Sequence, residues 1–423
     1  MAIRFGVIAD DFTGATDVAS MLVRAGLRTV QAIGVPDGAA PADVDAVVVA
    51  LKTRTVPAAD AITQSLAALA WLREAGATRF YFKYCSTFDS TPRGNIGPVA
   101  DALMRELDTG LTVVCPAFPE NGRTVYAGHL FVGEQLLSDS GMRDHPLTPM
   151  TDSSLPRLLQ PQLQQGHLIG LVPHAVVTQG APAIRERLAT LREQGVRYAV
   201  TDALTNDDLR AIAKACEDLV LVTGASGLAL GLTPGEGGPT NIEVARLPNP
   251  GGASAVISGS CSVATQGQVA HWRAAGRAAF HIDAMRCADP SFDPAREALA
   301  WAASRLGDEP VLVYATSSPD EVRAAQQRFG VERAGAMVED CLARVARGLV
   351  DLGVRRLVVA GGETSGAVVK ALDIRQLRIG PTIAPGVPWT WAARPGLLLA
   401  LKSGNFGAVD FFSSALVSEP PAG

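Results

Sequence analysis

Short apolar runs alternate with longer segments of helical period along nearly the whole chain, and this alternation constrains the fold most. The apolar runs have the length of buried strands, and the segments between them have the length of helices. This alternation is typical of βαβ units, in which the strands of a sheet run parallel. The sequence therefore predicts an α/β fold with mainly parallel sheets flanked by helices.

The alternation is interrupted once, over residues 232–252, which are rich in proline and glycine. Such a composition indicates a linker, and 423 residues are enough for two domains of ordinary size. We expect a first domain over residues 1–235, a linker over 236–252, a second domain over 253–423, and an active site in the cleft between the domains. The expected strands are 3–9, 28–33, 45–50, 79–84, 111–115, 167–172, 197–201, 219–223, 253–257, 278–282, 311–315, 355–360 and 397–401, and the expected helices include 58–74, 96–107, 183–194 and 207–217.

Composition argues against several classes of partner. The net charge of −5 gives no basic footprint for nucleic acid or an anionic membrane surface. No apolar run approaches the ~18 to 20 residues of a membrane span, and residues 3–9 read as a strand of the fold rather than a signal peptide. The six cysteines show no zinc-binding spacing. We therefore expect a cytoplasmic protein with no membrane or nucleic-acid partner.

Two adjacent carboxylates, Asp10 and Asp11, follow the first expected strand. Ligands of open α/β sheets bind outside the carboxyl ends of strands, beside the positive N-terminus of the next helix. Either carboxylate can accept hydrogen bonds from a sugar hydroxyl or take up a proton as a general base. Capping of the helix by Asp11 or Thr13 is an equally good explanation of this segment.

A second polar segment, residues 82–97, runs from the end of another expected strand into a helix. It holds Lys83 and Arg93, the carboxylate Asp89 and several hydroxyls, among them Ser90 and Thr91. Lysine and arginine form charge-assisted hydrogen bonds with carboxylates and phosphates. The segment therefore indicates an anion-binding turn, with a solvated surface turn as the weaker alternative.

Three further strand-to-turn segments in the second half are rich in glycine and hydroxyls: 258–262, 361–366 and 402–407. Glycine lets the backbone approach a phosphate, and free N–H groups at helix starts complete an anion cradle. No Walker A loop and no protein-kinase segment is present. Glu363 can hold Mg²⁺ through water or contact a ribose, and Lys402 can offset phosphate charge; helix capping and a surface ion pair are the respective alternatives.

These segments together resemble the four-carbon acid sugar kinase family. The resemblance rests on residues 9–15, 83–94, 361–365 and 402–407 and spans nearly the whole chain. Within the family, residues 82–91 followed by 94–98 are most similar to the members that act on 3-oxo-tetronate.

The resemblance implies ATP-dependent phosphorylation of the terminal C4 hydroxyl of 3-dehydrotetronate (3-oxo-tetronate), with Mg²⁺, an acid-sugar domain first and a nucleotide-binding domain second. On the sugar side it implies Asp10, Asp11, Lys83, Asp89, Ser90, Thr91 and Arg93. From their positions at adjacent strand ends, we expect Asp11 or Asp10 to be the catalytic base and Lys83 or Arg93 to bind the C1 carboxylate. On the nucleotide side it implies Ser258, Ser260, Gly361, Gly362, Glu363, Thr364 and Gly404. The metal ligands and the oligomeric state stay open, with a homodimer as one candidate.

Three other functions stay open at this point. D-threonate or D-erythronate kinases of the same family differ in an acceptor group that leaves no motif. A nucleotide-dependent oxidoreductase also uses glycine turns after strands, although no GxGxxG follows the first strand. A two-domain sugar-acid sensor would bind its ligand and leave ATP intact.

Overall fold

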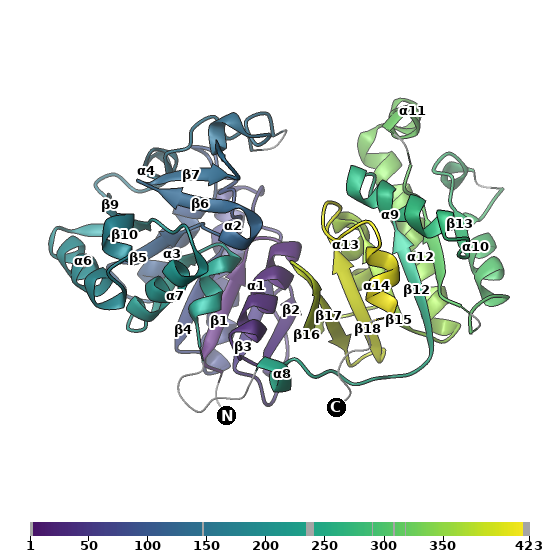
Figure 1. Ribbon diagram of the computed structural model, residues 1–423, viewed down its shortest axis with the longest axis horizontal. Helices are drawn as coiled ribbons and strands as arrows, with labels where there is room; N and C mark the ends of the chain where they lie inside the picture. Colours follow the sequence, from purple (N-terminus) through teal and green to yellow (C-terminus); the bar gives the residue numbers. More distant parts are fainter. Residues whose placement is uncertain are drawn as a thin grey trace. The chain divides into compact units, whose positions relative to one another are not determined.

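A computed structural model describes residues 3–145, 148–233, 241–289, 291–307, 309–317 and 319–417 of the chain. The chain divides into two compact units, Met1–Ala245 and Arg246–Gly423 (Figure 1). Of the expected linker, residues 236–240 lie outside the described residues, and Asn241–Val244 form a short helix, α8.

The first unit is built on a sheet with the strand order β2-β3-β1-β4-β11-β5-β10-β9. Every pair of neighbouring strands in this order is parallel. The strands are β1 (Phe5–Ala9), β2 (Thr29–Ile33), β3 (Ala46–Ala50), β4 (Arg79–Lys83), β5 (Thr112–Cys115), β9 (Leu168–Val172), β10 (Val196–Thr201) and β11 (Leu221–Gly224). The chain leaves β1 toward β2 and leaves β4 toward β5, on opposite sides, so β1 and β4 form the switch point of the sheet.

The central strands β1 and β3 consist of apolar residues and are buried along their whole length, because helices cover the sheet. α2 and α3 pack on each other, and the segment η4 (Ser226–Gly231) packs between α1 and α7. The helices of the unit are α1 (Phe12–Arg24), α2 (Ala58–Glu74), α3 (Ile96–Glu106), α4 (Leu155–Leu159), α5 (His174–Val177), α6 (Ala181–Glu193) and α7 (Asn206–Ala215). A separate antiparallel sheet is formed by β6 (Arg123–Tyr126), β7 (His129–Val132) and β8 (Gln135–Leu136).

The second unit has a sheet with the order β13-β14-β12-β15-β18-β17-β16. It is parallel from β13 to β18, and its last two strands are antiparallel. The strands are β12 (Ala253–Ser258), β13 (Ala279–His281), β14 (Val311–Tyr314), β15 (Val354–Ala360), β16 (Gln376–Ala384), β17 (Val387–Ala392) and β18 (Leu397–Lys402). Here β12 and β15 are the switch point, since the connections that follow them diverge.

The core of the second unit joins its sheet to α9 and α14. Trp272 of α9 and Phe411 and Phe412 of α14 are fully buried against Val256 and Val358 of the sheet. α12 packs against α10, α11 and α13. The helices are α9 (Val263–Ala274), α10 (Pro294–Ala303), α11 (Pro319–Phe329), α12 (Val331–Asp351), α13 (Gly362–Ala371) and α14 (Phe411–Val417).

The α/β prediction is confirmed, and each expected strand is present to within two residues at either end. Among the described residues, five strands were not expected from the sequence: β6, β7, β8, β16 and β17. β16 and β17 contain Gly380, Pro381 and Pro388, residues that argue against a strand because proline cannot donate to the ladder. β6 to β8 are short and lie in a polar segment without a clear period of two.

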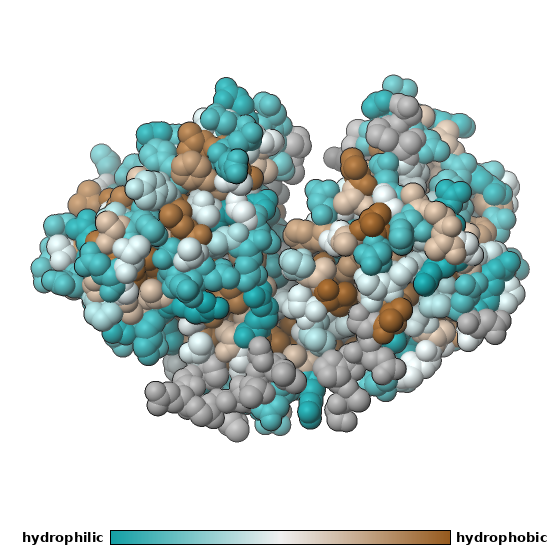
Figure 2. Space-filling model, in the orientation of Figure 1, coloured by the Kyte–Doolittle hydropathy of each residue, from teal (hydrophilic) through white to brown (hydrophobic). Residues whose placement is uncertain are grey.

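Hydrophobic residues on the face shown in Figure 2 are scattered in small groups among hydrophilic ones. Isolated surface residues of this kind are normal in globular proteins. No helix within the described residues combines the length and apolar character needed to cross a membrane.

Candidate active site

The first candidate site is a cluster of charged side chains at the carboxyl ends of β1, β3 and β4. Ala9 of β1 is paired with Ala50 of β3 on one side and with Lys83 of β4 on the other. The residues that follow these strands are therefore neighbours, and the cluster lies at the switch point of the first sheet, where α/β proteins bind ligands.

Arg54, four residues beyond β3, joins the carboxylates of the cluster. Its guanidinium donates from Nε and Nη2 to the two oxygens of Asp10, both at 2.8 Å, and from Nη2 to Asp11 Oδ1 at 2.6 Å. Its Nη1 lies 3.6 Å from Asp89 Oδ2. One arginine thus holds three carboxylates from two strand ends in fixed positions.

Asp11 caps α1 and is also part of the charged cluster. Its carboxylate accepts the Gly14 N–H at 3.1 Å, and Lys83 Nζ lies 3.5 Å from Oδ1. Burial alone would raise the pKa of Asp11, but Lys83, Arg54 and the Gly14 N–H together lower it to about 2. The capping and the functional interpretations of Asp11 are therefore compatible.

Lys83 is buried against the first turn of α1, with 4% of its surface exposed. Burial would lower its pKa, but Asp11 and Asp10 raise it, so the ammonium stays charged. A Cβ added at Gly14 would lie 1.7 Å from Lys83 Nζ. Glycine at position 14 is what lets the lysine reach Asp11 past the helix backbone.

The turn after β4 presents Asp89 in a strained conformation. Phe88 and Asp89 have φ angles of 65° and 42°, which side-chain-bearing residues adopt rarely. Thr87 Oγ1 donates to Asp89 Oδ1 at 2.6 Å, and the buried Phe88 ring packs edge-on against Tyr84. Strain of this kind persists where surrounding contacts enforce it and is frequent at functional sites.

The remaining predicted residues of this segment differ in their accessibility. Ser90 is buried and donates to Gln162 Oε1 at 3.0 Å, whereas Thr91 is half-buried. Arg93 is exposed, and its guanidinium makes no hydrogen bond or ion pair with the described residues. Arg93 is thus a cation of this segment that is available to an anionic ligand.

Sequence reasoning missed Arg54 and Asn95. Asn95 Nδ2 donates to the carbonyls of Thr53 and Val56 at 2.7 and 2.8 Å, which fixes the loop that carries Arg54. The sequence signal that could have identified Arg54 was its position just after the apolar run 46–50, which forms the fully buried strand β3. Its contacts with Asp10 and Asp11 depend on β3 lying beside β1, which the sequence does not specify.

The second candidate site is a pocket of about 690 Å³ in the second unit. It begins at the switch point, where Ser258 of β12 is paired with Ala360 of β15. The turns after these strands contribute Gly259, Ser260 and Gly361 to Thr364 to its lining. A Cβ added at Gly259 would lie 2.3 Å from Thr364 Oγ1, so the two turns approach closely only because this residue is glycine.

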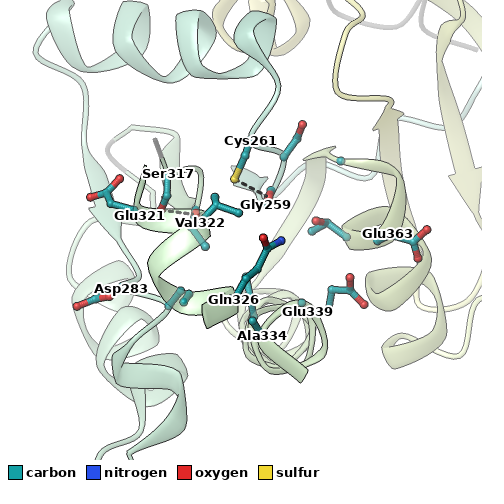
Figure 3. A pocket seen from close by; sticks show the side chains of 18 of the residues that line it. Gly259, Cys261, Asp283, Ser317, Glu321, Val322, Gln326, Ala334, Glu339 and Glu363 are labelled. Atoms are coloured by element: carbon teal, nitrogen blue, oxygen red, sulfur yellow. Dashed lines mark hydrogen bonds between the residues drawn. The ribbon is translucent and has the colours of Figure 1, made fainter. Parts of the chain in front are cut away.

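Helices α11 and α12 and the segment after β13 form the rest of the pocket. Figure 3 shows the Gln326 side chain pointing into the pocket, with Asp283 on one side and Glu339 and Glu363 on the other. Small apolar side chains complete this part of the lining: Val322, Ala325, Ala334 and Val338. The sequence prediction concentrated on strand ends and did not include these helical residues.

Two of the predicted nucleotide residues lie beside the pocket lining. Ser258 is fully buried, and its hydroxyl is 2.7 Å from Thr316 Oγ1. A Cβ at Gly404 would lie 2.5 Å from Ser260 Oγ, so the turn after β18 packs on the turn after β12. Ser260, Gly361, Gly362, Glu363 and Thr364 line the pocket directly.

The turn after β15 leads directly into a helix at the edge of the pocket. Gly361 has a φ of 130°, and the N-terminus of α13 begins directly after it. The hydroxyl of Ser365, in the first turn of α13 but outside the pocket lining, is buried and has no hydrogen-bond partner among the described residues. An anion at this helix start would accept hydrogen bonds from the free backbone N–H groups there.

The described residues contain no group of three or more His, Cys, Asp or Glu side chains arranged to hold a metal ion. Mg²⁺ in kinases is usually held by one or two carboxylates together with the phosphates of the substrate and water. Glu363 and Glu339 in the pocket lining fit that lighter requirement.

Two family models match the two halves of the chain. Residues 5–232 match a sugar-binding N-terminal domain, and residues 255–412 match a nucleotide-binding C-terminal domain. The charged cluster lies within the first range and the glycine-rich pocket within the second. This organisation defines a two-domain protein class with one sugar-binding and one nucleotide-binding domain.

Relatives of known name cover almost the full chain. A 3-oxo-tetronate kinase of Cupriavidus necator is 57% identical, over 97% of this chain and 96% of its own. One from Pseudomonas savastanoi pv. phaseolicola is 55% identical with the same coverage. A crystal structure from Salmonella typhimurium LT2, provisionally described as a tRNA synthase, superposes with a TM-score of 0.91 at 47% identity and covers 98% of this chain and 99% of its own. The chain belongs to the 3-oxo-tetronate kinase branch of the four-carbon acid sugar kinase family.

Proposed function

We propose that this protein is an ATP-dependent kinase that transfers the γ-phosphoryl group of ATP to the C4 hydroxyl of 3-oxo-tetronate. The observation that carries the proposal is identity of 57% over nearly the full length with a 3-oxo-tetronate kinase. The charged cluster and the glycine-rich pocket supply the two half-sites that such a reaction needs.

On the sugar side, Asp11 and Asp10 accept hydrogen bonds from the acceptor, and one of them takes the proton of the C4 hydroxyl. The C4 oxygen forms a bond to the γ-phosphorus as the bond to the bridging oxygen of ADP breaks. Because the transition state is loose, positioning contributes more than basicity, and a carboxylate with a low pKa suffices.

The carboxylate of the acid sugar is bound by Arg93 in this proposal. Lys83 is buried and already faces Asp11, whereas the Arg93 guanidinium is exposed. Asp89, Ser90 and Thr91 lie in the same turn and are suited to the hydroxyl and keto groups, which require hydrogen bonds rather than charge.

On the nucleotide side, the phosphates of ATP bind the turns at Ser260 and at Gly361 to Thr364, beside Ser258 and Gly404. The adenine ring binds the small apolar side chains of α11 and α12, which suit a flat aromatic ring. Mg²⁺, carried by the phosphates, would neutralise charge on the transferred group, and Glu363 is the residue that would hold it through water.

In-line transfer requires contact between the acceptor hydroxyl and the γ-phosphate. An active site in a cleft between the two domains therefore stays part of the proposal. The cytoplasmic location and the homodimer stay predictions, and light scattering of the purified protein tests the second.

A second candidate, D-threonate or D-erythronate kinase activity, would use the same site. An oxidoreductase or a sugar-acid sensor gains no support from the names of the relatives, which are kinases. RNA is disfavoured as a partner by the net charge of −5.

The direct test is analysis of the product formed from Mg-ATP and 3-oxo-tetronate by phosphorus and proton NMR. We expect ADP and an equal amount of a monoester whose phosphorus couples to the C4 protons. Release of inorganic phosphate without an ester would contradict the proposal.

A further inference from the structure

Lys402 carries a buried ammonium group that forms no ion pair with a carboxylate of the described residues. The residue ends β18 with 1% of its surface exposed. Its Nζ donates to Thr265 Oγ1 at 2.9 Å and to the carbonyls of Ser403 and Gly404 at 3.1 and 3.0 Å. All three acceptors are neutral. Because burial of an unpaired charge is unfavourable, packing alone does not explain this residue.

The titratable side chains of the elements around Lys402 do not form an ion pair with it. They are Arg355 and Arg356 on β15, His271 and Arg273 on α9, Glu363 and Lys370 on α13, and Asp410 before α14. Burial lowers the pKa of Lys402 to about 8, so the ammonium is still mostly protonated at neutral pH.

Lys402 is connected to all three glycine-rich turns of the nucleotide side. Its carbonyl accepts the Gly361 N–H at 2.8 Å, and its Nζ holds the Gly404 carbonyl. Gly404 in turn packs against Ser260, because a Cβ added at Gly404 would lie 2.5 Å from Ser260 Oγ. The buried ammonium of Lys402 is thus linked to the turns that line the pocket.

We infer that Lys402 is a positioning residue of the nucleotide site, which holds these turns together and whose buried charge is neutralised when the phosphates of a nucleotide bind. The inference rests on the proposed function of the pocket. The bound anion then supplies the counter-charge that the protein lacks, and at low dielectric such a charge acts over several ångströms.

A link between nucleotide binding and protonation follows. Phosphates favour the charged form of Lys402 and therefore raise its pKa in the complex. Nucleotide affinity should be constant below about pH 8, where the free protein already carries the proton, and should fall as pH rises above that value. Binding near pH 8 should take up a proton from the buffer.

The experiment is calorimetric titration of the full chain with ADP, without acceptor, at about pH 7 and about pH 9. For the wild type we expect affinity to fall by as much as about tenfold between the two values. Lys402→Met should bind ADP at least about tenfold more weakly at pH 7 and lose most of the pH dependence. Lys370→Met, which removes an exposed lysine of α13, should behave as wild type.

Loss of the fold in Lys402→Met would give the same weak binding, so its thermal unfolding is measured alongside. We expect an unchanged or higher melting temperature, since the Gly404 carbonyl keeps the Ser262 and Thr265 hydroxyls as donors at 2.6 and 2.8 Å. If the variant does not fold, proton uptake by the wild type at about pH 8, measured in two buffers, decides the question.

The outcomes separate the inference from the proposed function. A wild type that binds no ADP would overturn both. A wild type that binds ADP without proton uptake, or a folded Lys402→Met that binds as tightly as wild type, would overturn the role of Lys402 alone.

Discussion

Arg54 determines the charge balance of the cluster at the carboxyl ends of β1, β3 and β4. It contacts Asp10 and Asp11 directly and lies near Asp89, and Lys83 is the second cation of the cluster. The carboxylates therefore outnumber the cations. In the proposed function, such a cluster binds hydroxyl groups and accepts a proton, and Arg93 binds the carboxylate of the substrate.

Replacement of Arg54 should damage the fold and the activity together. Arg54→Met leaves three carboxylates close together with Lys83 as their one remaining cation, and we expect a loss of about 3 kcal/mol in unfolding free energy. The ratio kcat/KM should fall at least about tenfold, because Asp11 loses the contact that orients it. Chemical denaturation and steady-state kinetics measure the two effects.

Arg28→Met is the matched control. Arg28 forms a similar bidentate pair with Asp45, and its side chain is 23% exposed against 22% for Arg54. The pair lies at the opposite, amino end of β3, so stability should fall while kcat/KM stays near wild type. Equal kinetic losses in both variants would show that Arg54 acts only through stability.

Asp11→Asn tests the proposed proton acceptor. The variant keeps the size of the side chain and one acceptor oxygen for the Gly14 N–H, and we expect kcat to fall by about 10²-fold or more. Asp45→Asn, a paired carboxylate at the amino end of β3, should leave kcat unchanged. Near-normal turnover of Asp11→Asn would remove Asp11 from the mechanism.

The lowered pKa of Asp11 also has a consequence for acid stability. The folded-state pKa of about 2 lies below the ordinary value of 3.8. Asp11 therefore stabilises the fold above the ordinary value, and this contribution is lost as pH falls through about 2. Because Asp11 stays ionised near neutral pH, its titration should not change kcat/KM there. A profile of kcat/KM against pH checks this expectation.

The sequence indicated Asp10, Asp11, Lys83 and Asp89 because each lies at a strand end in a polar run. It did not indicate Arg54, whose partners come from another strand. A motif records residues that are neighbours in sequence, and this contact exists only after β3 pairs with β1.

At the scale of elements, both candidate sites lie at a switch point of a parallel sheet. In the first unit, α1 starts directly after the carboxylates, and its first turn approaches Lys83. In the second unit, α13 starts directly after Gly361. In each case a helix N-terminus lies next to groups suited to a polar ligand.

Gly14→Ala tests the close approach of α1 and Lys83. Alanine favours a helix over glycine by about 1 kcal/mol, but its Cβ would overlap the Lys83 ammonium at 1.7 Å and Asp11 Oδ1 at 2.3 Å and displace them. We expect kcat/KM to fall at least about tenfold, with unfolding free energy within about 1 kcal/mol of wild type.

Gly267→Ala in α9 is the control for helix propensity. Its Cβ would meet Val409 Cγ2 at 3.9 Å, an ordinary contact, so stability should hold or rise and activity should not change. Full activity of Gly14→Ala would show that Lys83 need not lie at its observed position.

The regular elements were predictable where periodicity was strong. Residues 58–74 were expected as a helix, and α2 has these bounds. β16 and β17 were not expected, because Gly380, Pro381 and Pro388 oppose strand formation locally. Pairing of β16 with β17 and of β17 with β18 overrides that preference, as does packing of Leu247 over Gly380. None of these contacts is visible in the sequence.

At the scale of the whole molecule, the chain consists of two compact units, and each contains the match to one family model. Separate family models describe a sugar-binding and a nucleotide-binding domain, and the relatives named as 3-oxo-tetronate kinases contain both. Fold alone would not select the acceptor, since one hydroxyl or keto group distinguishes the alternatives.

The most direct measurement is kcat/KM of the purified protein with Mg-ATP for 3-oxo-tetronate, threonate, erythronate and a five-carbon aldonic acid, followed as ADP release. The account predicts the highest value with 3-oxo-tetronate, by about tenfold or more over the others. Turnover of threonate or erythronate alone would contradict the acceptor, and no turnover with any of the four would contradict the kinase itself.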